Sequence, residues 1–130
     1  ASLTEVDLRD NSLGDEGWCA VFDALRGNPQ NKINKWDLSS QCINPVICKS
    51  LAAYMAVGAS LTECNVCGNS LDKESATLLA KVATEKRVML FDIKHDQKEA
   101  NFSCQSLDPV DSILIASDLT ISTSLTSLRL

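Results

Sequence analysis

One stretch of this chain recurs at a fixed distance along it. Residues 41–62, QCINPVICKSLAAYMAVGASLT, return 64 positions later as residues 105–126, QSLDPVDSILIASDLTISTSLT. Self-similarity at a fixed offset is typical of a repeat protein, in which stacked units share one continuous core. The repeat therefore constrains the fold more strongly than any single residue does.

The offset of 64 residues spans two repeat units. Similar segments begin at about residues 3, 33, 61, 97 and 125, and they read LTEVDLRDNSL, INKWDLSSQCI, LTECNVCGNSL, QKEANFSCQSL and LTSLRL. Each segment alternates apolar and polar residues, which predicts a short strand with one buried face. The stretch after each of the first four segments has the apolar spacing of a helix. We therefore expect strand–helix units that stack with their strands parallel.

The common pattern, L-x-x-L-x-L-x-x-N-x-L, resembles the leucine-rich repeat, and the step of about 28 residues is similar to that of the ribonuclease-inhibitor subtype. The resemblance implies an α/β fold, a leucine-rich-repeat solenoid (horseshoe segment) with a parallel sheet on its concave face and helices on its convex face. Residues 1–130 would form a single domain of about four repeats plus the start of a fifth, and we expect a segment of a longer protein. The resemblance also implies that Asn11, Gln41, Asn69 and Gln105 hydrogen-bond the turn leaving each strand.

The repeat register predicts the elements. Strands should centre on residues 5–8, 35–38, 63–66 and 99–102 of one parallel sheet, and helices should lie near residues 15–26, 45–56, 73–85 and 109–119. Asn44 and Asp108 each precede a proline, so both are expected to cap a helix. Asp72 is expected to cap the third helix, and Asp15 or Gly14 the first.

The third repeat step contains an insertion at about residues 88–96. Val88–Ile93 is an apolar run, and Gln97 then stands where the other units place Leu or Ile. We expect the run to supply the missing apolar cover as an irregular hairpin of Val88–Ile93 against Glu99–Phe102. Residues 88–96 should protrude from the regular stack or form an extra strand beside the fourth unit. Deleting Met89–Asp96 would then restore a 28-residue step.

Side chains that point inward from strands and helices should form the core. Trp36 falls at an inward strand position and is expected to be a core residue, with the small Cys64 beside it compensating for its volume. In the fourth helix, the repeat register places Ile115, Ala116 and Leu119 inward.

Composition excludes several classes of function. The net charge is −5 and no basic stripe is present, which argues against nucleic-acid binding. No apolar run is long enough for a membrane span. Cys64 and Cys67 should point to opposite faces of one strand, so we expect no metal site and no cofactor. Reduced thiols predict an intracellular protein, cytoplasmic in the simplest case.

The sequence also predicts that the protein is not an enzyme. His95 is the single histidine and lies in the inserted turn, so no serine or cysteine triad can be assembled around a defined base. The outward positions of the strands form three polar rows: the first begins with Glu5, the second with Asp7 and the third with Arg9. Side chains expected to point outward on the concave face are therefore the candidate partner-binding residues: Glu5, Asp7, Arg9, Lys35, Asp37, Glu63, Asn65, Glu99 and Asn101.

Asp7 and Asp37 should be close, because neighbouring strands lie roughly 4.8 Å apart. The mild repulsion between the two carboxylates would be relieved by a basic side chain of a partner. The function we expect is a protein–protein interaction module that binds a protein partner through the concave face or edges. The alternatives are a GTPase-activating or regulatory repeat array and a structural subunit inside a large assembly.

Overall fold

A computed structural model of the chain describes residues 3–69, 71–91, 93–102 and 107–129. Strands and helices alternate along it in the order that the repeat predicts. The elements are β1 (Glu5–Val6), α1 (Gly14–Arg26), β2 (Lys35–Asp37), α2 (Pro45–Val57), β3 (Glu63–Asn65), α3 (Lys73–Lys86), β4 (Glu99–Asn101), α4 (Pro109–Ile121) and β5 (Ser127–Arg129). The fold is thus α/β, with four helices and two small parallel sheets within the described residues, and it is compatible with a leucine-rich-repeat-like arrangement.

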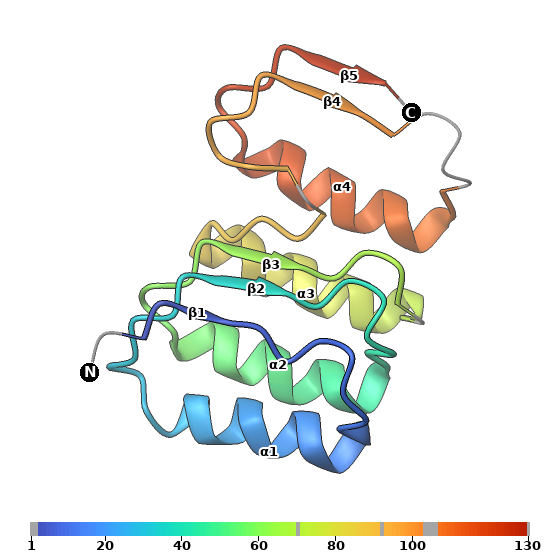
Figure 1. The fold of residues 1–130 in the computed structure, drawn as a ribbon. Coiled ribbons are helices and arrows are strands. Elements are labelled where there is room, and N and C mark those ends of the chain that lie inside the picture. The colour runs from blue at the N-terminus through green and yellow to red at the C-terminus, as the bar shows by residue number, and fades with distance from the viewer. Residues whose placement is uncertain (1–2, 70, 92, 103–106, 130) are drawn as a thin grey trace.

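The strands form two sheets, so the prediction of one sheet is wrong. The first sheet has the order β1-β2-β3, and Lys35 of β2 pairs with Glu5 and Glu63 on its two sides. The second sheet pairs Glu99 of β4 with Ser127 of β5. Figure 1 shows α1, α2 and α3 under the first sheet and α4 under the second. The face of the strands turned away from the helices is called the open face below.

The inserted segment explains the break between the sheets. Met89 forms a parallel bridge with Glu63, the Cys64 N–H donates to the Met89 carbonyl at 2.8 Å, and the Val66 N–H donates to the Leu90 carbonyl at 3.0 Å. The predicted hairpin with residues 99–102 is therefore wrong, and the extra strand lies beside the third unit and not the fourth. The segment occupies the edge of β3 that β4 would otherwise use.

The expectation that this run is buried is confirmed. Val88, Met89, Leu90 and Ile93 are each at most 1% exposed. Met89 and Ile93 pack with Ala100 and Ile121 in a small second core cluster. Deleting Met89–Asp96 would remove these contacts and the pairing with β3, so we no longer expect it to restore a regular step.

Helix caps follow the sequence at three of the four helices. The side chains of Asn44, Asp72 and Asp108 accept hydrogen bonds from the backbone N–H groups of residues 47, 75 and 111. The cap expected at α1 is wrong, because Leu13 precedes that helix and makes no side-chain cap. Asp15 instead accepts a 2.6 Å hydrogen bond from the Asn44 side chain, which links the starts of α1 and α2.

Aromatic side chains fill the core under the first sheet. Trp36 is 3% exposed, as predicted, and its indole N–H donates to the Tyr54 hydroxyl at 3.2 Å. Phe22 lies between Trp36 and Tyr54, with ring centroids 5.5 and 6.1 Å away. Cys64 pairs with Trp36 across the sheet and is fully buried. A small residue beside the indole keeps the core close-packed.

The buried side of α4 differs from the prediction. Ile115 is buried as expected, but Ala116 and Leu119 are exposed. Asp118 is fully buried instead, and its carboxylate accepts hydrogen bonds from the backbone of Leu90 and Phe91. These bonds to the inserted segment fix a rotation of α4 that the repeat of apolar residues does not predict.

Candidate protein-binding face

The nine predicted binding residues are divided between the two sheets. Lys35, Asp37, Glu63, Asn65 and Glu5 lie on strands of the first sheet, Asp7 and Arg9 follow the end of β1, and Glu99 and Asn101 lie on the second sheet. The nine residues therefore do not form one evenly spaced ladder. All are exposed except Glu63 and Asn65, which are half-buried.

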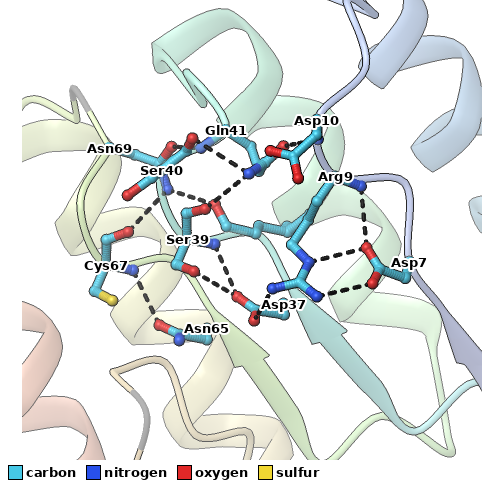
Figure 2. A network of polar contacts seen from close by, with 11 residues as sticks. Asp7, Arg9, Asp10, Asp37, Ser39, Ser40, Gln41, Asn65, Cys67 and Asn69 are labelled. Atoms are coloured by element: carbon cyan, nitrogen blue, oxygen red, sulfur yellow. Dashed lines mark hydrogen bonds and ion pairs between the residues drawn. The ribbon is translucent and has the colours of Figure 1, made fainter.

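Arg9 joins the two carboxylates that sequence analysis placed close together (Figure 2). Its Nε and Nη2 atoms donate to Asp7 at 2.9 and 2.8 Å, and its Nη1 atom donates to Asp37 Oδ2 at 3.1 Å. The chain's own guanidinium thus compensates both charges. The uncompensated repulsion that the sequence predicts between these carboxylates is therefore absent, because Arg9, expected in a separate outward row, reaches both of them.

The guanidinium also changes the acidity of its first partner. Hydrogen bonding from the Arg9 side chain and backbone lowers the pKa of Asp7 from its ordinary value near 3.8 to about 2. The pKa of Arg9 is raised by the same contact with Asp7 and by the charge of Asp37. Both groups therefore stay charged over the physiological pH range.

A side-chain turn closes the end of each strand of the first sheet. Asp7, Asp37 and Asn65 accept hydrogen bonds from the backbone N–H two residues ahead, each at 3.1 Å. Such local bonds are characteristic of Asp and Asn in turns. One oxygen of each side chain is thus committed to the backbone, which holds the second outward row in fixed orientations. In the sequence, this turn is indicated by an Asp or Asn at the strand end, two residues before Arg9, Ser39 or Cys67.

A ladder of amide side chains lies one turn further along (Figure 2). Asn69 donates to the carbonyls of Leu38 and Val66, and its oxygen accepts from the N–H groups of Gln41 and Ile43. Gln41 and Asn11 likewise bond the turn that leaves their own strand. The structural role implied for these positions is confirmed at 11, 41 and 69, and Gln105 lies outside the described residues.

A pocket of about 200 Å³ opens where the inserted segment meets the open face. Lys35, Asp37, Glu63 and Asn65 line it from the strands. Met89, Ile93 and Lys94 line it from the inserted segment. Lys35 and Glu63 form a loose ion pair with Nζ and Oε2 3.9 Å apart. The sequence does not predict this pocket, because the expected position of the inserted segment is beside the fourth unit.

The thiol groups and the histidine occupy different settings. Cys64 is fully buried and Cys67 half-buried, in agreement with their predicted opposite faces. Burial raises the pKa of Cys48 to about 12 and also raises the pKa of Cys64. His95 is half-buried and its Nε2 atom lies 3.1 Å from the Thr62 carbonyl. Among the described residues, no three His, Cys, Asp or Glu side chains are grouped to hold a metal ion.

Parallel strands, alternating helices and an amide ladder are compatible with an arrangement of the leucine-rich-repeat type, and the chain is similar to proteins whose names include LRR domains. The chain is 30% identical over 99 residues to the mouse protein named NACHT, LRR and PYD domains-containing protein 14. It is 29% identical over 80 residues to human NACHT, LRR and PYD domains-containing protein 3. The alignments cover 76% and 62% of the chain but only 10% and 8% of these relatives. No protein-family model matches the chain.

No helix among the described residues has the length and apolar character that crossing a membrane requires.

Proposed function

We propose that this chain is a protein–protein interaction module that binds a protein partner through its open face. The proposal includes a leucine-rich-repeat solenoid of the ribonuclease-inhibitor-like subtype, in which the open face is concave. Support comes from pairing registers of 28 residues, Lys35 with Glu63 and Glu99 with Ser127, and from the similarity to two proteins whose names include LRR domains. The role is a non-enzymatic one inside the cell, consistent with buried thiols at Cys48 and Cys64.

The observation that carries the proposal is the fixed geometry of the polar side chains on the first sheet. Arg9 is held by Asp7 and Asp37, and the turn at each strand end fixes the second outward row. Side chains already ordered in the free protein lose little conformational entropy on binding. A surface of this kind is suited to recognising a partner with defined registry, since charges fixed in position contribute to specificity and association rate.

Site-specific crosslinking tests this proposal. A photoreactive amino acid replaces Lys35 on the open face or Lys49 on α2 in the full-length protein, and adducts are identified by mass spectrometry after irradiation in cells. Both lysines are exposed, so the two variants are matched. We expect one recurrent protein adduct from position 35 and none from position 49. Adducts from position 49 alone would assign binding to the helices and contradict the proposal.

A further inference from the structure

The pocket at the edge of the inserted segment is too small for a typical small-molecule ligand. Its volume is about 200 Å³, whereas sites for drug-sized ligands and cofactors usually enclose about 300–1,000 Å³. A volume of this size holds one side chain. The pocket lies on the open face, between β2, β3 and the side chains of Met89, Ile93 and Lys94, so an extended segment crossing that face would pass over it.

The acidic groups of the pocket are already compensated. The carboxylate of Asp37 accepts from Arg9 Nη1 at 3.1 Å and from the Ser39 hydroxyl at 2.6 Å. The carboxylate of Glu63 lies near Lys35 Nζ, and its side chain is only 23% exposed. The carboxylates of Asp37 and Glu63 therefore already interact with side chains of this chain.

Two donor groups of the pocket are uncompensated. Within the part of the chain that the structure describes, the Lys94 ammonium has no ion pair. The Asn65 side chain uses its oxygen to accept from the Cys67 N–H, and among described residues its NH₂ group makes no hydrogen bond. Met89 and Ile93 add an apolar wall next to these donors. The pocket thus combines two hydrogen-bond donor groups that have no acceptor among the described residues with an apolar wall against which methylene groups can pack.

From this combination we infer that the pocket binds a glutamate side chain presented by an extended segment of the protein partner. The carboxylate accepts hydrogen bonds from the Lys94 ammonium and the Asn65 amide, and the two methylene groups contact Met89 and Ile93. A charge-assisted pair of this kind is about twice as strong as a neutral one. The inference rests on the proposed function, because it names a chemical feature of the partner that the open face would hold.

The test uses three blocked pentapeptides, acetyl-Gly-Gly-X-Gly-Gly-amide with X as Glu, Gln or Lys. Each is titrated into the ¹⁵N-labelled protein, and the side-chain NH₂ signals of Asn65 are followed by NMR. The signals are assigned with an Asn65→Asp variant. A single anchoring side chain should bind in roughly the millimolar range, and replacing Glu by Gln should weaken binding about fivefold, which corresponds to about 1 kcal/mol.

Two charge reversals complete the test. Lys94→Glu should abolish the response to the Glu peptide, whereas Lys49→Glu on α2 should leave it unchanged. Equal responses to Glu and Gln peptides, or a response that survives Lys94→Glu, would overturn the inference. The crosslinking experiment at positions 35 and 49 is independent of this outcome. Adducts from position 35 without a preference for the Glu peptide would therefore refute this inference alone. Adducts from position 49 alone would refute the proposed function.

Discussion

The backbone N–H of Leu90 donates a 2.6 Å hydrogen bond to the carboxylate of Asp118, a side chain of α4 with no exposed surface. The neighbouring N–H of Phe91 donates to the second oxygen at 2.8 Å. Leu90 and Phe91 follow Met89, which bridges to Glu63, and the Leu90 carbonyl in turn accepts a hydrogen bond from the Val66 N–H. A buried carboxylate thus satisfies two neighbouring backbone donors in the segment that pairs with β3.

Replacing Asp118 with Ala should destabilise the protein by about 3–6 kcal/mol. The estimate follows from leaving two buried N–H groups without an acceptor, each bond to a charged group being worth about 1.5–3 kcal/mol. Asp118→Asn should cost less, because the amide retains one acceptor oxygen. Urea denaturation measures both changes. The exposed Asp23→Ala on α1 is the control, and a loss for Asp118→Ala no larger than the control's would refute this role.

Trp36→Ala should lower the free energy of unfolding by about 3–5 kcal/mol, as expected for truncating a buried Trp. Trp36 is 3% exposed and packs against Phe22 at 5.5 Å between ring centroids. Trp36→Phe should cost less because it keeps most of the ring volume. Thermal or urea unfolding of both variants provides the measurement. Equal stability of the Ala variant and the wild type would show that the indole is not part of the core.

The Asp7 carboxylate should titrate near pH 2, well below its ordinary value near 3.8. Because the folded-state pKa is the lower one, any stabilisation from the pair with Arg9 is present above about pH 4 and is lost as the pH falls through 2. A ¹³C NMR titration of the side-chain carboxyl reads the pKa directly. Arg9→Gln should return it towards 3.8, and an ordinary pKa in the wild type would contradict the contact.

The cysteines should differ in their reactivity towards a thiol reagent such as DTNB. Cys42 is exposed and should react before Cys48 and Cys64. Cys48 and Cys64 are buried with raised pKa values, so their thiolate fraction at pH 8 is small and they should react only as the protein unfolds. Mass spectrometry of the denatured, alkylated chain should find six free thiols, as the sequence contains six cysteines. A native disulfide or rapid labelling of Cys64 would contradict this prediction.

The sequence was sufficient to predict the order of strands and helices because the pattern repeats. Apolar alternation placed Trp36 and Cys64 inward, and cap residues such as Asn44 marked helix starts. The break in the sheet could not be predicted in the same way. Val88–Phe91 is apolar enough to pair with any free strand edge, and the sequence does not show whether it pairs with β3 or with β4.

The candidate site was predictable only as a set of outward positions. Alternation along each strand shows that Asp7 and Asp37 point away from the core, but it does not show which oxygen each side chain commits to its own turn. Arg9 could be assigned to a row, whereas its reach across to Asp37 depends on side-chain conformation. The pocket beside the inserted segment depends on the path of that segment. The repeat pattern does not predict this path, because the other units have no such insertion.

The central claim is that the open face binds a protein partner, and the affinity of folded variants for the crosslinked partner tests it most directly. Asp37→Lys removes the group that holds Arg9 and Ser39, and Asn65→Arg adds bulk to a half-buried position of the same face. Lys49→Glu on α2 and Asp23→Lys on α1 are the matched controls, and melting curves confirm that all four variants are folded. The account predicts at least about tenfold weaker binding, about 1.4 kcal/mol, for the two open-face variants and unchanged binding for the controls. Unchanged binding of both folded open-face variants would contradict it.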